Sequence, residues 1–214
     1  MSIHAVPGRL TIGVLAVQGS FSEHEALVVA AGADARQVRR SEQLQGLDGL
    51  ILPGGESSTV GLVAGESGLL DSMRAAIGAG LPAFGTCAGM IMLARATTGG
   101  TQPLLGGIDM TVRRNAYGRQ QASFEAPLKV PVLGEPTLDG VFIRAPWIEG
   151  AGPEVETLAS YAGRAVLVRQ GDLLAAAFHP EFTEDARLHA YFLDIVRQRR
   201  SEAQQNTGGV RVRA

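Results

Sequence analysis

Residues 84–89 read FGTCAG and join an apolar run at Leu81–Phe84 to a second apolar run at Met90–Arg95. We expect the first run to form a short strand and the second to form a helix. The spacing Gly-x-Cys-x-Gly allows the sharp strand-to-helix turn that presents the nucleophile in many hydrolases, with Cys87 in place of serine. This turn would hold the sulfur at the positive end of a helix, where the thiolate is favoured.

Cys87 is the only cysteine in the 214 residues. An isolated cysteine is most often a small buried apolar residue, so that interpretation stays open beside the nucleophile. The backbone N–H of Ala88 would point at the same space as the sulfur and is a candidate donor to an oxyanion. A single cysteine excludes an internal disulfide, which fits a reducing, cytoplasmic compartment.

Length and composition favour one domain, expected over residues 1–200, with a disordered tail at 201–214. Hydrophobic residues make up 45% of the chain and charged residues 19%, which is enough apolar material for a large core. The net charge of −2 offers no basic excess for nucleic acid. No signal peptide is evident at Met1–Arg9, and no apolar run approaches the ~20 residues that a membrane helix needs. Lys129 is the only lysine, so imine chemistry on this chain is disfavoured.

The first half of the chain alternates apolar runs with amphipathic segments, which favours a parallel sheet covered by helices on both faces. Ser22 and Glu25 are expected to form a capping box at the start of the first helix. The expected strands are Leu10–Val17, Ala33–Val38 and Leu47–Leu52. The expected helices are 23–32, Ser58–Ala64 and Leu69–Ala79. We therefore expect a three-layer α/β fold.

The second half is richer in short strands, expected to be antiparallel additions to that sheet and its edge. Residues Thr97–Gly107 resemble a loop, and Glu184–Arg199 has the pattern of a final amphipathic helix. The expected strands are Ile108–Arg113, Ser123–Val130, Gly140–Arg144, Glu154–Ser160, Ala165–Arg169 and Leu173–Ala177.

A second candidate catalytic element, FHPE at 178–181, follows the last of these strands. Pro180 ends the strand, and His179 and Glu181 share one side of the extended chain. An imidazole oriented by a carboxylate can serve a thiol nucleophile, so Cys87, His179 and Glu181 form a candidate triad. Alone, the segment would equally suit an ordinary surface loop. The remaining helical histidines, His24 and His189, are expected to be surface or packing residues.

A third candidate element is PGGESS at 53–58, which lacks the Gly-Lys-Ser/Thr ending of a phosphate-binding loop. Its glycines let backbone N–H groups approach a ligand, and Gly55 is a candidate second oxyanion donor. A plain tight turn is the alternative. This segment follows the carboxyl end of an expected strand, and Gln18 and Cys87 each follow the end of another. Parallel sheets place their sites at these strand ends.

The chain resembles the class I (triad) glutamine amidotransferases, whose fold is flavodoxin-like. The resemblance covers about residues 10–197 and is closest to the glutaminase subunits of pyridoxal 5′-phosphate synthases. The Cys87 turn and the His-x-Glu pair are shared across the whole superfamily. The segments more specific to these subunits are Arg114–Gln120, Ser123–Ala126 and Phe142–Pro146. The segments that carry the resemblance are Ile12–Gly19, Leu50–Ser57, Phe84–Gly89, Arg114–Gln120, Ser123–Ala126, Val141–Pro146 and Phe178–Glu181.

The resemblance implies that Cys87 is the nucleophile, His179 the acid and base, and Glu181 the orienting carboxylate in hydrolysis of L-glutamine. It implies no metal and no cofactor in this chain. It also implies a hetero-oligomer in which ammonia passes to a barrel-shaped synthase subunit for vitamin B6 biosynthesis. That partner would activate the glutaminase, with the Gly54–Gly55 peptide as the candidate switch. The residues implied to line the glutamine site are Gly54, Gly55, Glu56, Arg114, Ile143 and Arg144.

Two other functions stay open at this point. One is a different cysteine hydrolase on the same scaffold, such as a γ-glutamyl peptidase. The other is a binding subunit that keeps the fold without the reaction. The chain departs from the pattern of the resemblance at Arg113, where an acidic residue is expected, and at Trp147, where some relatives carry histidine.

Overall fold

The computed structural model describes residues 8–56, 65, 67–100, 102–114 and 123–208. Within these residues the strands form sheets of seven, three and two strands. The strands of the largest sheet are β1 (Thr11–Leu15), β2 (Asp34–Val38), β3 (Gly49–Leu52), β4 (Ala83–Thr86), β10 (Glu156–Tyr161), β11 (Arg164–Gln170) and β12 (Leu173–Ala176). Their order across the sheet is β10-β11-β12-β4-β3-β1-β2.

The sheet is parallel from β12 to β2, and β11 and β10 extend it as antiparallel strands at one edge. Every residue of β3 and β4 is buried, as expected for continuous apolar strands covered on both faces. The succession β2-β1-β3-β4-β12 follows the flavodoxin-like order. The carboxyl ends of β1, β3, β4 and β12 therefore meet at one edge of the sheet.

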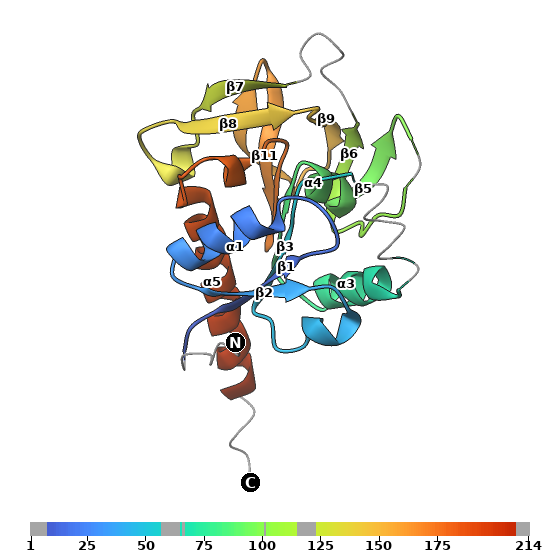
Figure 1. The fold of residues 1–214 in the computed structure, drawn as a ribbon, viewed down its shortest axis with the longest axis vertical. Helices are drawn as coiled ribbons and strands as arrows, with labels where there is room; N and C mark the ends of the chain where they lie inside the picture. Colours follow the sequence, from blue (N-terminus) through green and yellow to red (C-terminus); the bar gives the residue numbers. More distant parts are fainter. Residues whose placement is uncertain (1–7, 57–64, 66, 101, 115–122, 209–214) are drawn as a thin grey trace.

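Helices cover both faces of this sheet (Figure 1). Helices α1 (Phe21–Ala30) and α5 (Arg187–Gly208) lie on one side, and α3 (Leu69–Gly78) and α4 (Ala88–Leu93) lie on the other. Short 3-10 helices are η1 (Ser41–Leu44), η2 (Pro131–Leu133) and η3 (Pro180–Phe182). The expected three-layer, mostly parallel α/β fold is confirmed.

The second half of the chain differs in part from the expectation. β12 joins the main sheet as a parallel strand rather than an antiparallel one, and only β10 and β11 extend the sheet as antiparallel strands. A separate three-stranded sheet contains β5 (Ala94–Thr98), β6 (Ile108–Arg113) and β9 (Trp147–Ala151). A two-stranded sheet contains β7 (Ser123–Leu128) and β8 (Leu138–Ile143). β5 follows α4 directly, where the sequence predicts the end of a helix and a loop. β9 is not predicted, because its three exposed residues include a glycine and leave little apolar alternation.

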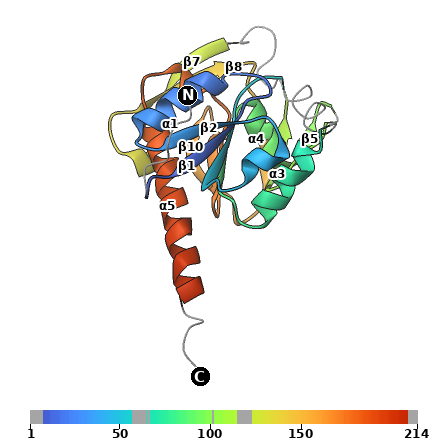
Figure 2. The ribbon, with the colours of Figure 1, turned by 60° about the horizontal axis from the view of Figure 1, so that its bottom comes forward.

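The ends of two helices also differ from the prediction. The predicted capping box at Ser22 is wrong, because α1 starts at Phe21 and the Ser22 hydroxyl donates to Glu23 instead. Helix α5 starts at Arg187 and continues to Gly208, so residues 201–208 are helical rather than part of a disordered tail. The helix formers Glu202, Ala203 and Gln204 explain this extension, and Figure 2 shows the end of α5 reaching away from the body. The helix predicted at Ser58–Ala64 lies outside the described residues.

Candidate active site

Cys87 occupies a strained turn between β4 and α4. Its φ of 48° and ψ of −101° lie in a region that residues with a side chain rarely adopt. A Cβ on Gly85 would lie 2.5 Å from the carbonyl of Gly89, and a Cβ on Gly89 would lie 1.9 Å from the carbonyl oxygen of Leu52. The two glycines that flank Cys87 are therefore required by close backbone contacts, as the predicted nucleophile turn demands.

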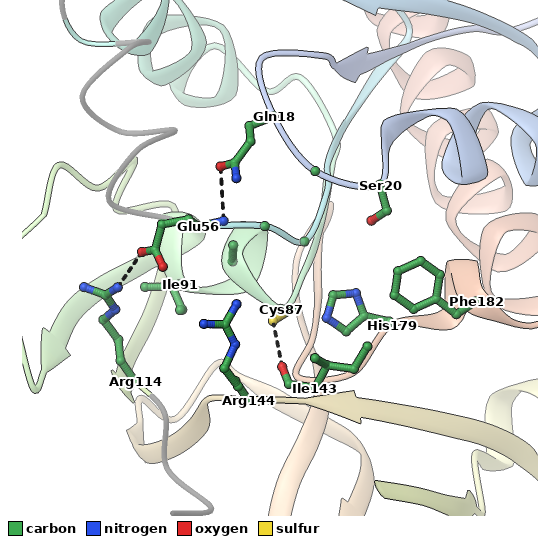
Figure 3. A pocket seen from close by; sticks show the side chains of 14 residues that line it. Gln18, Ser20, Glu56, Cys87, Ile91, Arg114, Ile143, Arg144, His179 and Phe182 are labelled. Carbon is green, nitrogen blue, oxygen red and sulfur yellow. Dashed lines mark hydrogen bonds and ion pairs between the residues drawn. The ribbon is translucent and has the colours of Figure 1, made fainter. Parts of the chain in front are cut away.

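Strand pairing brings His179 to Cys87. β12 lies parallel to β4 with Ala176 opposite Thr86, and the N–H of Cys87 donates to the carbonyl of Ala176 at 2.8 Å. The segments that follow β4 and β12 leave the sheet at the same edge, and His179 lies three residues after the end of β12. Figure 3 shows the Cys87 sulfur beside the His179 imidazole. The pairing of β4 with β12 thus brings together two residues that lie far apart in the sequence.

Glu181 lies behind the imidazole, at the first turn of η3. Its Oε1 lies 2.8 Å from His179 Nδ1 and also accepts a hydrogen bond of 2.6 Å from the hydroxyl of Ser20. The carboxylate side chain is completely buried. Cys87, His179 and Glu181 are therefore brought together in the order expected of a triad, with the carboxylate fixing the imidazole.

The electrostatics of the site favour a protonated His179 beside an ionised Glu181. Burial alone would lower the pKa of His179, but hydrogen bonds to Cys87 and Glu181 and their negative charges outweigh burial and raise the pKa to about 10. Burial would raise the pKa of Glu181, but His24 and His179 lower it well below its usual range. The imidazole is thus protonated at neutral pH beside an ionised carboxylate.

A pocket of about 280 Å³ opens in front of the sulfur (Figure 3). It contains each residue that the resemblance assigns to glutamine binding. Gly54 closes one wall, and a Cβ there would lie 2.2 Å from Cε1 of His179. The lining residues are Gln18, Gly19, Ser20, Gly54, Gly55, Glu56, Cys87, Ala88, Ile91, Arg114, Ile143, Arg144, His179 and Phe182.

Polar groups border the far side of the pocket. Arg114 donates to Glu56 Oε1 at 2.8 Å, and the backbone N–H of Glu56 donates to Gln18 Oε1 at 3.2 Å. Arg144 has a φ of 45° and directs its guanidinium over the pocket (Figure 3). Among the described side chains none pairs with this guanidinium. The pocket therefore presents both a cation and a carboxylate to a small ligand.

The two candidate oxyanion donors, Gly55 and Ala88, both line the pocket beside Cys87. Gly55 has a φ of 153°, which favours glycine, and lies against Gly19 and the side chain of Gln18. The sulfur itself lies 3.9 Å from the carbonyl oxygen of Ile143. The end of β8 thus borders the nucleophile through its backbone.

Sequence reasoning missed several residues of this region. Ser20 binds the carboxylate and Phe182 stacks on the His179 ring at a centroid distance of 5.0 Å. Both carry a positional signal, because Ser20 follows β1 at the active edge and Phe182 adjoins the His-x-Glu pair. His24 and His189, expected to be surface or packing residues, are fully buried and hydrogen-bonded to each other, so the surface alternative is excluded for both.

The sequence of this chain matches known proteins over most of its length. A family model described as the SNO glutamine amidotransferase family matches residues 14–198. The chain belongs to this family. A relative from Parafrankia sp., named pyridoxal 5′-phosphate synthase subunit PdxT, is 55% identical over 188 residues, which cover 87% of this chain and 93% of the relative. A protein of the same name from Moorella thermoacetica is 51% identical over 87% of this chain and its own full length.

A solved structure supports the assignment to the glutamine amidotransferases, and a second one shares the fold. A crystal structure described as a glutamine amidotransferase has a TM-score of 0.82 at 50% identity, covering 86% of this chain and 98% of that one. The structure of PurLQS from Thermotoga maritima has a TM-score of 0.60 at 17% identity, covering 89% of this chain and 97% of that one. At that identity the second likeness concerns the fold alone.

Two further features are absent from the described part of the chain. No group of three or more His, Cys, Asp or Glu side chains there is arranged to hold a metal ion. No helix in the same residues combines the length and apolar character needed to cross a membrane.

Proposed function

We propose that this chain is the glutaminase subunit of a pyridoxal 5′-phosphate synthase, with residues 1–200 as one glutaminase domain. It hydrolyses L-glutamine to L-glutamate and ammonia through Cys87, His179 and Glu181. The observation that carries the proposal is the buried Cys87–His179–Glu181 constellation at the floor of a pocket for a small charged ligand. The family membership and the names of relatives at 51–55% identity support the synthase assignment.

In this proposal the pocket binds glutamine by its charged α-carbon substituents. The Arg144 guanidinium takes the α-carboxylate, because it faces the pocket without a carboxylate partner among the described residues. Glu56 takes the α-ammonium, and its ion pair with Arg114 holds it in place. A cation and a carboxylate at these positions would orient the side-chain carboxamide toward the sulfur.

Acylation begins from the thiolate–imidazolium pair. The Cys87 thiolate attacks the carboxamide carbon, and the N–H groups of Gly55 and Ala88 donate to the oxygen as it becomes negative. His179 donates its proton to the nitrogen, the carbon–nitrogen bond breaks, and ammonia leaves. A γ-glutamyl thioester remains on Cys87, and His179 is neutral.

Deacylation restores the resting state. Neutral His179 takes a proton from water, and the hydroxide attacks the thioester carbon. The carbon–sulfur bond then breaks to release glutamate and the Cys87 thiolate, with His179 again protonated. Glu181 accepts from Nδ1 throughout and keeps the reacting Nε2 toward the sulfur. The chemistry asks for no metal or cofactor in this chain.

We further propose that the ammonia is used by a barrel-shaped synthase subunit in a hetero-oligomer. The relatives are named as subunits of pyridoxal 5′-phosphate synthase, which implies a second kind of subunit for the synthase reaction. Docking of that subunit would act on the Gly54–Gly55 peptide, which contacts both His179 and the side chain of Gln18. The pocket would be competent only after docking.

The experiment compares three nitrogen sources with and without the cognate synthase subunit: glutamine, a longer γ-glutamyl amide, and free ammonia in place of glutamine. The proposal expects glutamate release from glutamine, faster with the synthase present, and glutamine-dependent pyridoxal 5′-phosphate formation that free ammonia replaces. Preferential cleavage of the longer amide would instead indicate a peptidase. Absence of glutamate release with the synthase present would contradict the proposal.

A further inference from the structure

A chain of polar side chains continues from Glu181 into the protein interior, away from the pocket. His24 of α1 places Nε2 3.3 Å from Glu181 Oε2 and 3.1 Å from Thr86 Oγ1. Its Nδ1 lies 2.9 Å from Nε2 of His189 in α5. Both imidazoles are completely buried. The carboxylate therefore contacts an interior pair of histidines through the oxygen that does not face the pocket.

The neighbours of His24 decide which ring nitrogen carries hydrogen. A lone pair on Nε2 would face the ionised carboxylate of Glu181 and be repelled, whereas an N–H there is attracted to it. Burial lowers the pKa of His189 to about 3, so the His189 ring is neutral. An Nε2–H on His189 then donates to Nδ1 of His24.

The remaining nitrogen supports this arrangement. Nδ1 of His189 has no hydrogen-bond partner among the described residues. The opposite arrangement, with His24 donating to His189, would leave a buried N–H without an acceptor at that atom, which proteins rarely tolerate. The hydrogen bond between the two imidazoles thus runs from His189 to His24, whose Nε2 lies within ion-pair distance of the carboxylate.

The groups that face His24 come from three elements. The titratable ones are Glu181 from η3 and His189 from α5, while β4 contributes the hydroxyl of Thr86 and the ring of Phe84. Oε1 of the carboxylate accepts from two donors, whereas Oε2 has no hydrogen bond among the described residues and lies 3.3 Å from Nε2 of His24. A buried carboxylate oxygen without a donor is costly, so His24 determines how the carboxylate is oriented.

We propose that His24, oriented by His189, is a positioning residue for the triad of the proposed function, on which this inference rests. When His179 gives its proton to the leaving nitrogen, the attraction between the ring and Glu181 weakens. A carboxylate held by its second oxygen keeps Oε1 on Nδ1 during that step. The imidazole therefore retains the orientation needed to activate water.

The test compares His24→Leu with His24→Gln in glutaminase kinetics with the synthase subunit present. Gln retains an N–H donor near the place of Nε2, and Leu does not. Substitution of residues that orient reacting groups commonly costs about 10–100-fold, so His24→Leu should lower kcat by that factor with KM changed less than about 2-fold. His24→Gln should recover most of kcat. The titration midpoint of His179, followed by ¹⁵N NMR, should fall in the Leu variant only.

Phe192→Leu is the matched control, because Phe192 packs on Phe84 from the same face without a polar contact. A folded His24→Leu variant with wild-type kcat would overturn the inference. So would an equal loss in the control, or a Gln variant as slow as the Leu variant.

Ring ¹⁵N shifts of the wild-type protein give a reading that needs no variant. The inference expects hydrogen on Nε2 of His24, and an unprotonated Nε2 would overturn it even where the Leu variant does not fold. Failure of the proposed function can be distinguished from failure of this inference. If the proposed function is wrong, Cys87→Ala hydrolyses glutamine like the wild type. The ring ¹⁵N shifts report on the protonation of His24 in either case.

Discussion

The backbone of Gly54 lies against the ring of His179, so closely that a Cβ on Gly54 would come within 2.2 Å of Cε1 and 2.8 Å of Nδ1. The end of β3 therefore fixes the position of an imidazole that belongs to the segment after β12. Neither residue can move without disturbing the other, and this contact makes the glycine a part of the candidate active site.

Gly54→Ala should displace the imidazole from the sulfur. A shift of about 1 Å in a reacting group costs roughly 10²-fold in rate, so we expect at least that loss in kcat with the protein still folded. Steady-state glutaminase assays and circular dichroism check this. Gly150→Ala is the control, because no atom lies within 4 Å of a Cβ at that position. Wild-type activity in Gly54→Ala would show that catalysis does not depend on the present position of the His179 imidazole.

The protonation of His179 provides a second prediction. Its pKa is raised from 6.5 to about 10, so its contribution to stability is complete below about pH 6.5 and is lost as the pH rises through about 10. A ¹⁵N NMR titration should show the ring protonated through neutrality. In Cys87→Ala the midpoint should fall, because the hydrogen bond to the sulfur and its charge are removed. An unchanged midpoint in that variant would exclude the ion pair.

Ser20 is expected to help hold the carboxylate. Ser20→Ala removes the 2.6 Å hydrogen bond to Glu181 Oε1, which at a charged acceptor is worth about 2 kcal/mol, or roughly 30-fold in an equilibrium. We therefore expect a loss in kcat of about 10-fold, with Ser20→Thr retaining most of the activity. Ser22→Ala, whose hydroxyl contacts only the exposed Glu23 carboxylate in the described hydrogen bonds, should change nothing.

Arg144 is expected to determine substrate affinity. Arg144→Gln removes the guanidinium that faces the pocket, and loss of a charged hydrogen bond of about 2 kcal/mol should raise KM by roughly 30-fold. The expected effect on kcat is small, because the residue binds the unreactive end of glutamine. Arg113→Gln is the matched control, since Arg113 pairs with Glu149 at 3.3 Å outside the pocket. Equal KM values for the two variants would show that the α-carboxylate of glutamine binds elsewhere.

Much of the fold could be predicted from the sequence, because buried parallel strands are continuous apolar runs. β1, β3, β4 and β12 were expected within a few residues, and their carboxyl ends carry the site. The antiparallel second half was harder to predict. β9 contains three exposed residues and β5 begins directly at the end of α4, so neither has the local alternation that marks a strand.

The residues of the candidate site likewise fall into those that the sequence predicts and those that it does not. Cys87, His179 and Gly55 stand beside glycine or proline at the ends of strands, and such local signals survive in a single sequence. The roles of Ser20, His24 and His189 depend on contacts across the fold, with Glu181 161 residues from Ser20 along the chain. A buried histidine in a helix has no local mark that separates it from an exposed one.

The most direct test of the account compares glutamate release from L-glutamine by the wild-type protein and by Cys87→Ala, both assayed with the cognate synthase subunit. The account predicts release by the wild type and none above background by the variant, whose fold and binding to the synthase should be unchanged. Release by Cys87→Ala at the wild-type rate would contradict it.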